Sequence, residues 1–249
     1  MTVTTTADGI NRSLTAMIHG ESKTGKSRLA VTAPEPRLMH DVEGGHKFLP
    51  IKVKYWDPVA SAPPEYDGSW DTCVVVTTSY EQMLRSYAWL QSGAHPFKSV
   101  IVDSITELQV KAIESIAGRE QLQLQTWGEL LRAITGLMRD LRDLTMHPTN
   151  PLQAVVLTAM TREQNGMRRP YLQGQSAVTA PYLYDITGYL AIEEWPNPDP
   201  TLPPISYRRM HIKASNKFIA GERVDGRLGD VIEQDDLNIA HMIDRVYGT

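Results

Sequence analysis

The sequence has 249 residues, of which 41% are hydrophobic and 22% charged, and its formal net charge is -4. This length allows one α/β domain with a large core, and the composition is that of an ordinary globular protein. The weakly acidic balance excludes a surface coated in positive charge, so any contact with nucleic acid must come from a local basic patch.

The first half of the chain alternates between predicted strands and predicted helices. Apolar and β-branched runs predict strands over 14–18, 38–42, 53–55, 73–77, 100–102 and 154–157. Helical spacing and capping signals predict helices over 26–31, 105–116 and 122–144, and another that begins at Thr78 or Ser79 and runs to about Leu90. Strands that alternate with helices are typical of a mainly parallel sheet covered by helices on both faces.

The chain changes character after residue 160. Residues 161–181 are polar and basic and are predicted to form a loop, followed by strands over 186–192 and 207–212 with a proline-rich connection. A short amphipathic helix is predicted over 236–246. We therefore expect a flexible tail over 1–12 and a single α/β domain over 13–249, with antiparallel strands added at the C-terminal end of the sheet.

Cysteine usage and hydropathy bear on the compartment. Cys73 is the one cysteine in the sequence and lies in an apolar run, so we expect a buried free thiol and a reducing compartment. The threonine-rich N-terminus lacks the apolar block of a signal peptide, and no apolar run reaches the ~18 residues of a membrane span. We expect a cytoplasmic protein without membrane contact.

The strongest motif lies between the first strand and the first helix. Residues 20–27 read Gly-Glu-Ser-Lys-Thr-Gly-Lys-Ser, the phosphate-loop pattern Gly-x4-Gly-Lys-Ser. In this pattern backbone amides and the helix N-terminus surround the phosphates, Lys26 reaches the β- and γ-phosphates, and Ser27 binds magnesium. The sequence therefore predicts ATP and Mg²⁺ as ligands. The predicted nucleotide contacts are Gly20, Glu21, Ser22, Lys23, Thr24, Gly25, Lys26, Ser27 and Arg28. Lys23 either touches phosphate or is a solvated loop lysine.

Acidic residues at two other strand ends complete the predicted site. Asp103 follows the apolar run 100–102, where it either holds magnesium through a water or caps the next helix, a role that Ser104 could take instead. Asp41 and Glu43 follow the second strand, and i, i+2 spacing on a strand would point both acids into one cleft. We predict that Glu43 orients the attacking water; the alternative is a pair of solvated loop acids.

The order of these parts resembles the RecA-like ATPase core. Within that superfamily the chain resembles the phage-encoded nucleotide-binding proteins of the Sak-type single-strand annealing group, over residues 14–225. Asp41-Val42-Glu43 looks like the segment of the RecA-like core that carries the catalytic glutamate, and Val102-Asp103-Ser104 looks like its magnesium-aspartate strand. The features that carry the Sak-type resemblance are His40-Asp41-Val42-Glu43-Gly44-Gly45, Thr126-Trp127-Gly128, Arg169-Pro170-Tyr171-Leu172-Gln173-Gly174 and Ala220-Gly221-Glu222-Arg223. Such proteins commonly have a lysine where this chain has Gly221.

The resemblance implies further roles. Thr158 corresponds to the polar sensor of the fourth core strand, and Arg223 or Lys217 is a candidate to reach a neighbouring subunit's nucleotide. A phage-encoded protein would work in the host cell cytoplasm. It would assemble head-to-tail with itself into a ring or filament, and it could have a single-strand binding protein as a partner.

The segment after the fourth core strand is the predicted contact with single-stranded DNA. This segment has three arginines, Arg162, Arg168 and Arg169, and one acid, Glu163. Flexible arginines suit contact with phosphate groups, and Tyr171 could stack on a base. An ordinary exposed loop is the alternative for these residues.

The sequence thus indicates an ATP-hydrolysing RecA-like protein that binds single-stranded DNA and promotes annealing or recombination. Two other functions stay open: a small-molecule kinase with a phosphate loop, whose acceptor lid would be the segment from Thr161, and a nucleotide-gated binding protein with little turnover.

Overall fold

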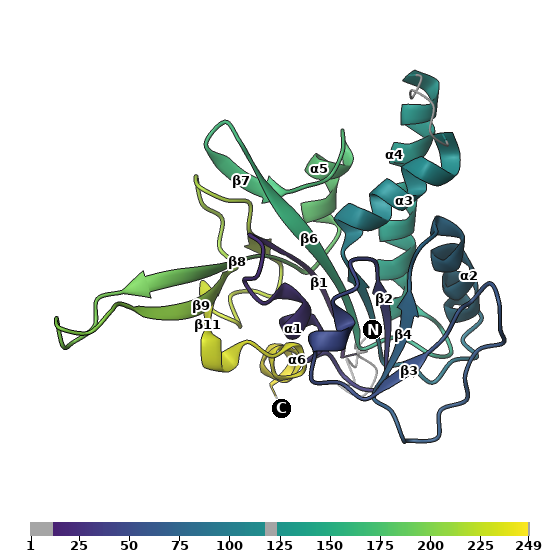
Figure 1. Ribbon diagram of the computed structural model, residues 1–249, viewed down its shortest axis with the longest axis horizontal. Helices are drawn as coiled ribbons and strands as arrows, with labels where there is room; N and C mark the ends of the chain where they lie inside the picture. Colours follow the sequence, from purple (N-terminus) through teal and green to yellow (C-terminus); the bar gives the residue numbers. More distant parts are fainter. Residues whose placement is uncertain (1–11, 118–123, 249) are drawn as a thin grey trace, which may run out of the picture.

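The computed structural model describes residues 12–117 and 124–248 (Figure 1). Residues 1–11 of the predicted tail, and the first two residues of the helix predicted from 122, lie outside the described residues.

A mostly parallel sheet forms the centre of the fold. Its strands lie in the order β11-β9-β8-β1-β6-β5-β2-β4-β3, with β7 paired to β6 and β10 to β8. The parallel strands are β1 (Leu14–Gly20), β2 (Arg37–Asp41), β3 (Val53–Tyr55), β4 (Thr72–Val76), β5 (Ser99–Asp103), β6 (Ala154–Gln164) and the first half of β8 (Ile186–Trp195). The predicted fold class, a mainly parallel sheet flanked by helices with antiparallel C-terminal strands, is confirmed.

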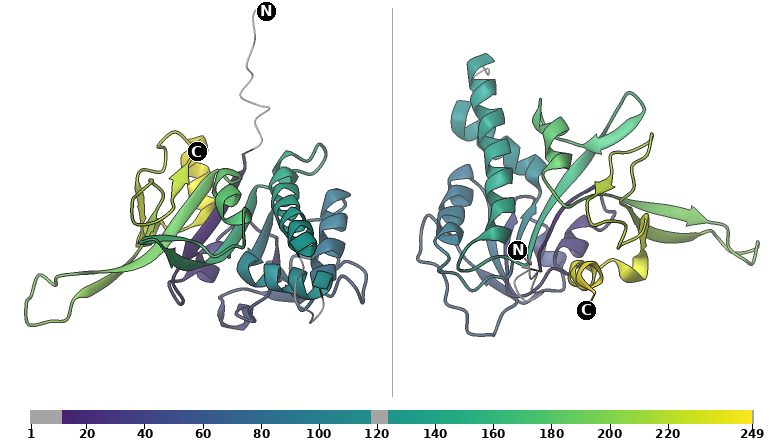
Figure 2. Two further views of the ribbon diagram at one scale, coloured as in Figure 1. Left: turned by 90° about the horizontal axis from the view of Figure 1, so that it is seen from above. Right: turned by 180° about the vertical axis from the view of Figure 1, so that it is seen from behind.

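Helices cover both faces of this sheet (Figures 1 and 2). One face carries α2 (Tyr80–Gln91), α3 (Ile105–Ala117), α4 (Leu124–Asp143) and the short α5 (Ser176–Thr179), and the other carries α1 (Lys26–Ala30) and α6 (Ile239–Tyr247). Single turns of 3-10 helix occur at His46–Phe48, Leu144–Met146, Ala180–Tyr182 and Gln234–Asp236. Burial on both faces explains why β1, β2 and β5 are buried at every position.

The helices form where their sequence signals predict them. The apolar stripe of α4 is buried, at Leu130, Ile134, Leu137, Leu141 and Leu144. Of the two capping-box alternatives before α2, the structure has Ser79 and Gln82. Among the described residues, no helix is long and apolar enough to cross a membrane.

The C-terminal strands form a projecting arm. β8 pairs antiparallel with β9 (Ile205–His211) along its outer half, and β9 pairs with β11 (Val231–Glu233), while β10 (Gly221–Glu222) lies against β8. The β8–β9 ribbon extends away from the body of the molecule, and we call it the arm (Figure 2).

The prediction of a loop over residues 161–181 is wrong for residues 161–170, which form a β-hairpin. β6 continues to Gln164, turns at Asn165-Gly166 and returns as β7 (Met167–Pro170). Both turn residues have positive φ, 55° and 73°, as a two-residue hairpin turn of type I′ requires, and Asn-Gly is the preferred pair for it. The basic residues of this segment therefore lie on a β-hairpin.

Candidate functional site

The carboxyl ends of four adjacent parallel strands, β1, β6, β5 and β2, meet at one edge of the sheet, where ligands of open α/β sheets bind. A cavity of ≈ 510 Å³ lies there. Its lining residues are Gly20, Glu21, Ser22, Lys23, Gly25, Lys26, Ser27, Arg28, Glu43, Gly45, Leu49, Asp103, Met160 and Thr161. The structure thus brings together, from separate parts of the chain, the loop and two of the acids selected from the sequence.

The loop between β1 and α1 depends on its glycines. A methyl group added at Gly20 would come within 2.2 Å of the Leu190 carbonyl oxygen on β8, so only glycine fits there. Gly25 has φ 104°, which side-chain-bearing residues rarely adopt, and Lys23 is also in the left-handed region at φ 65°. Thr24, which does not line the cavity, is buried and its hydroxyl donates to the Glu21 carbonyl at 3.0 Å. These contacts hold the loop curled around the cavity.

Lys26 lies across the loop. Its Nζ donates to the carbonyl oxygens of Gly20 at 3.0 Å and Glu21 at 2.8 Å. Burial lowers the pKa of the Lys26 ammonium, and the nearby carboxylates of Glu43 and Asp103 act in the opposite direction. An ammonium in this position supplies the positive charge that a phosphate group needs.

Asp103 is buried, with 3% of its surface exposed. The Thr158 hydroxyl, on the neighbouring strand β6, donates to its Oδ1. Burial raises the pKa of Asp103, while hydrogen bonds from Thr158 and Ser27 lower it. The predicted sensor Thr158 and the predicted magnesium ligands Ser27 and Asp103 are therefore neighbours in space.

Ser104 connects Glu43 to the start of α3. Its hydroxyl donates to Glu43 Oε1 and accepts from the backbone N–H of Glu107 at 3.3 Å. Ser104 thus takes the capping role that the sequence left open between it and Asp103. Glu43 is held at the cavity by this contact, which spans 61 residues of sequence.

Asp41 does not point into the cavity with Glu43, and the expectation that both acids share a strand face is wrong. β2 ends at Asp41, so the i, i+2 rule of a strand no longer applies to Glu43. The Asp41 carboxylate accepts from the backbone N–H groups of Gly44 (2.9 Å), Gly45 (3.1 Å) and His46 (3.1 Å) and pairs with the His46 ring. Asp41 therefore stabilises the turn that presents Glu43.

These residues fit a magnesium nucleotide. Ser27 and Asp103 offer oxygen ligands, which Mg²⁺ prefers. Among the described residues no group of three His, Cys, Asp or Glu side chains could hold a metal ion without further ligands. Magnesium bound with a nucleotide commonly takes one or two protein ligands, with phosphate oxygens and waters in the other positions.

The predicted DNA-contact residues lie on the β6–β7 hairpin and just after it. Arg162 and Arg169 are paired across the two strands, and the Arg162 guanidinium lies 5.5 Å from the centre of the Tyr171 ring. Arg168 faces the phosphate loop, with its Nε 3.9 Å from Glu21. The hairpin therefore separates Arg168 from the other three side chains, which the sequence had placed on one loop.

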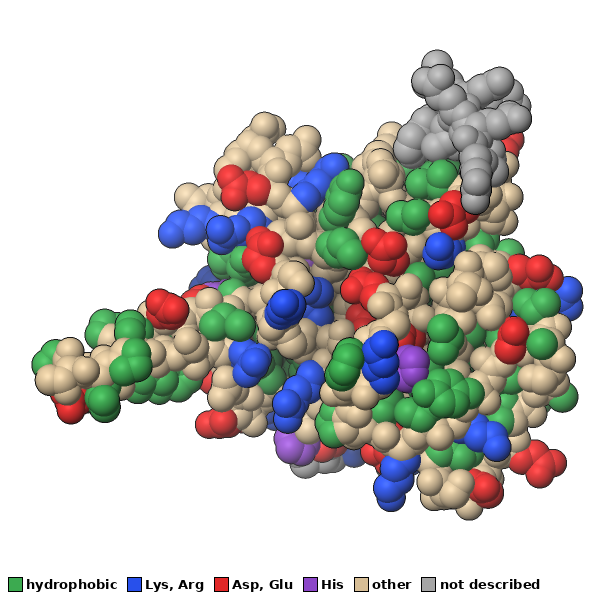
Figure 3. Space-filling model, in the orientation of Figure 1, with side chains coloured by type: hydrophobic (Ala, Val, Ile, Leu, Met, Phe, Trp, Pro, Cys, Tyr) green, Lys and Arg blue, Asp and Glu red, His purple; other side chains and the backbone are tan. Residues whose placement is uncertain are grey.

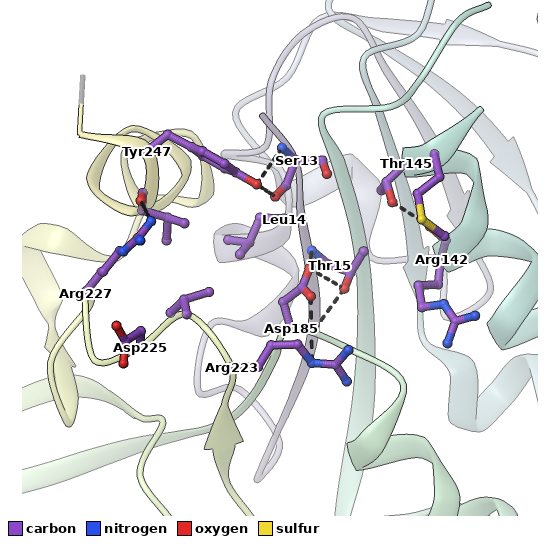
Figure 4. Close-up of a pocket in the computed structure, with 13 residues that line it drawn as sticks. Ser13, Leu14, Thr15, Arg142, Thr145, Asp185, Arg223, Asp225, Arg227 and Tyr247 are labelled. Carbon is purple, nitrogen blue, oxygen red and sulfur yellow. Dashed lines mark hydrogen bonds and ion pairs between the residues drawn. The ribbon is translucent and has the colours of Figure 1, made fainter. Parts of the chain in front are cut away.

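The two candidate trans-acting residues lie in different places. Lys217 borders a cavity beside the chain's own phosphate loop. Arg223 lies near the opposite end of β1, where it donates to the Tyr182 carbonyl and has its Nε 3.9 Å from Asp185. Figure 4 shows Arg223 beside Asp185 and Thr15, in a cavity of ≈ 500 Å³ at the amino end of that strand.

Sequence reasoning missed one contact to the phosphate loop. Arg208, on β9, donates from Nε to the Thr24 carbonyl at 3.1 Å. The two residues are 184 positions apart, and Arg208 belongs to no motif, so no local signal marked it.

Comparison with known proteins identifies the family. The sequence model described as an AAA domain matches residues 12–224. A search of curated proteins finds no match. Among solved structures, a similar chain comes from work described as "Structural and biochemical analysis of a prototypical ATPase from the type III secretion system of pathogenic bacteria"; it is 14% identical, with a TM-score of 0.46, and the alignment covers 72% of this chain and 52% of that one. The present chain thus spans about half the length of that ATPase chain. Since the family match covers most of the sequence, the chain belongs to the AAA domain family of P-loop ATPase domains.

Proposed function

We propose that this protein is a RecA-like ATPase that binds and hydrolyses ATP with Mg²⁺, with residues 13–249 acting as one domain. The observation that carries the proposal is the convergence of Lys26, Ser27, Glu43 and Asp103 on one cavity. Glu43 is also held in position by a hydrogen bond from Ser104, which favours an active site over one that has lost hydrolysis.

Each residue has a distinct role in this proposal. Lys26 leaves the Gly20 and Glu21 carbonyls to bind the β- and γ-phosphates, and the loop amides bind the remaining oxygens. Glu43 orients the water that attacks the γ-phosphate. Ser27 and Asp103 would hold Mg²⁺, which supplies charge neutralisation at the phosphates when bound. Thr158 fixes the orientation of Asp103.

We further propose that the protein binds single-stranded DNA and promotes annealing or recombination, as the resemblance to Sak-type phage proteins implies. The β6–β7 hairpin supports this, because it carries the exposed Arg168 and the half-buried Arg162 and Arg169, with Tyr171 at its base. Subunits would assemble head-to-tail, an arrangement that builds rings or filaments. Arg223 suits a trans-acting role better than Lys217, because it lies at the opposite end of β1 from the chain's own phosphate loop.

The test is the ATPase rate with and without single-stranded DNA, with particle size measured in parallel. We expect hydrolysis that single-stranded DNA accelerates and particles larger than a monomer. Lys26→Ala should abolish ATP binding, and Glu43→Gln should keep binding and lose turnover. Glu81→Gln, at an exposed position on α2, is the matched control.

Three results would contradict the proposal in separate ways. Full turnover by Glu43→Gln would remove the assigned role of that residue. Turnover indifferent to DNA would remove the DNA function. Transfer of the γ-phosphate to a metabolite would instead identify a small-molecule kinase.

A further inference from the structure

A second cavity lies directly behind the phosphate loop. It measures ≈ 680 Å³ and is bounded by the inner part of the arm, the β7 strand and residues 215–218. It shares Glu21 and Ser22 with the nucleotide cavity, so the two spaces lie on either side of the same loop segment. Neither the sequence motifs nor the ATPase reaction accounts for it.

Aromatic rings form one wall of this cavity. Tyr189 and Phe218 are stacked, with ring centroids 4.8 Å apart and an angle of 18° between the planes. His211 lies 4.8 Å from the Phe218 ring, and His19 packs behind Tyr189 at 5.2 Å. We call these three rings, Tyr189, His211 and Phe218, the ring layer. Tyr189 is buried beneath the others, with 4% of its surface exposed, so the half-buried Phe218 and His211 provide the ring surface on which an unpaired base can stack.

The charges around the cavity leave two cations available. Arg168 donates a side-chain hydrogen bond to the Tyr189 hydroxyl, its ion pairs are long, 3.9 Å to Glu21 and 4.0 Å to Glu163, and its side chain is 45% exposed. Lys217 has an exposed side chain that makes no ion pair or side-chain hydrogen bond with any described residue. Its backbone carbonyl accepts from the Arg168 N–H at 2.8 Å, which holds the two residues side by side.

The other acid of the cavity is already neutralised. Glu193 pairs with Arg209 at 2.9 Å and with the His211 ring at 2.6 Å. The cavity therefore combines a ring layer with two cations, Arg168 and Lys217, while Glu193 is already paired and Glu21 is held only by the long contact to Arg168. Figure 3 shows both basic and acidic side chains on the part of the molecule from which the hairpin and the arm project.

We infer that this cavity binds one nucleotide of a DNA single strand, with the base against Phe218 and His211, which Tyr189 supports from behind, and the phosphate on Arg168 and Lys217. This rests on the proposed single-stranded DNA binding and gives it a location. A ring layer inside a cavity needs an unstacked base, which a single strand offers and a duplex does not.

The location also predicts a link between DNA and ATP. A DNA phosphate at Arg168 replaces the long contact from that arginine to Glu21, and Glu21 belongs to the loop that surrounds the nucleotide. Two ligands that share a wall in this way change each other's affinity by the same factor.

The experiment measures binding of a fluorescently labelled oligo-dT strand by anisotropy, at several salt concentrations, for the full chain. We expect Phe218→Leu, which keeps apolar volume without the ring, to weaken binding about tenfold, the order found for loss of one stacked base. We expect Lys217→Ala to weaken it and to lower the salt slope by about one. Lys213→Ala is the matched control, because Lys213 is exposed on the same segment and paired with Asp230 at 2.7 Å.

ATP affinity and thermal unfolding of each variant are measured alongside. ATP affinity without DNA that stays at the wild-type level, together with weakened DNA binding, supports the inference. Wild-type DNA binding by both variants overturns it while leaving the proposed function intact. Absence of DNA binding by the wild type overturns the proposed DNA function itself. A loss of ATP affinity with DNA binding unchanged would assign the ring layer to the base of ATP and overturn the inference.

Discussion

A buried histidine beside the site makes folding stability depend on pH. His40 has no exposed surface and precedes Asp41 on β2. Its ring lies between the hydroxyls of Thr77 (3.0 Å) and Ser86 (2.7 Å), and no carboxylate within residues 12–117 and 124–248 contacts it to stabilise a positive charge. Burial lowers its pKa from 6.5 to about 3.

The sign and size of the effect follow from that shift. Between pH 6.5 and pH 3 the unfolded chain binds a proton at His40 that the folded chain does not, so the free energy of unfolding falls as the pH falls. At pH 5 the loss relative to pH 8 is about 2 kcal/mol for this residue, since each pH step below 6.5 costs about 1.36 kcal/mol. The value at pH 5 holds for any folded pKa well below 5.

The assay is urea unfolding of the wild type and His40→Gln at pH 8 and pH 5. Glutamine can still bond one hydroxyl but does not titrate, so we expect the wild type to lose about 2 kcal/mol more than the variant between the two pH values. Other buried histidines contribute equally to both proteins and cancel in the difference. His241→Gln, at an exposed position on α6, controls for loss of an imidazole. Equal losses for wild type and His40→Gln would refute the reasoning.

Two further predictions concern the site. Gly20→Ala should abolish ATP binding and lower the free energy of unfolding by about 1–3 kcal/mol, because the added methyl group meets the Leu190 carbonyl oxygen at 2.2 Å. Nucleotide titration measures the ATP binding and thermal unfolding measures the stability. The control is Gly136→Ala, where an added Cβ meets no atom within 4 Å, and this variant should unfold no more easily than the wild type. Ser104→Ala should cost about 1 kcal/mol by removing the cap of α3, and should lower kcat more than it raises KM because Glu43 loses its donor. Unchanged kcat in Ser104→Ala would show that this contact does not position Glu43.

The parts of the fold that the sequence predicts are those with local causes. Apolar strands such as β5, the phosphate loop and the Asp103 strand end each carry their signal within a few residues, and the structure has them where expected. The β6–β7 hairpin had a local signal too, Asn165-Gly166, but the surrounding polar and proline-containing residues concealed it.

The parts that could not be predicted depend on distant contacts. β2 ends at Asp41 because the turn that follows supplies three backbone N–H groups to that carboxylate, and strand periodicity alone gives no warning of this. The Ser104–Glu43 contact and the contact of Arg208 to the phosphate loop join segments far apart in sequence. No pattern in a single sequence encodes such pairs.

The close approach of Gly20 to β8 has a mechanical consequence. The phosphate loop packs against the arm at Leu190 and is hydrogen-bonded to it at Arg208. A tilt of the loop must therefore be accompanied by a rotation of the β8–β9 ribbon. Trp195 lies five residues beyond Leu190, about 17 Å along an extended strand. A tilt of about 10° at the pivot thus displaces that end of the ribbon by about 3 Å. A small rotation of the phosphate loop is therefore expected to produce a larger displacement at the outer end of the β8–β9 ribbon.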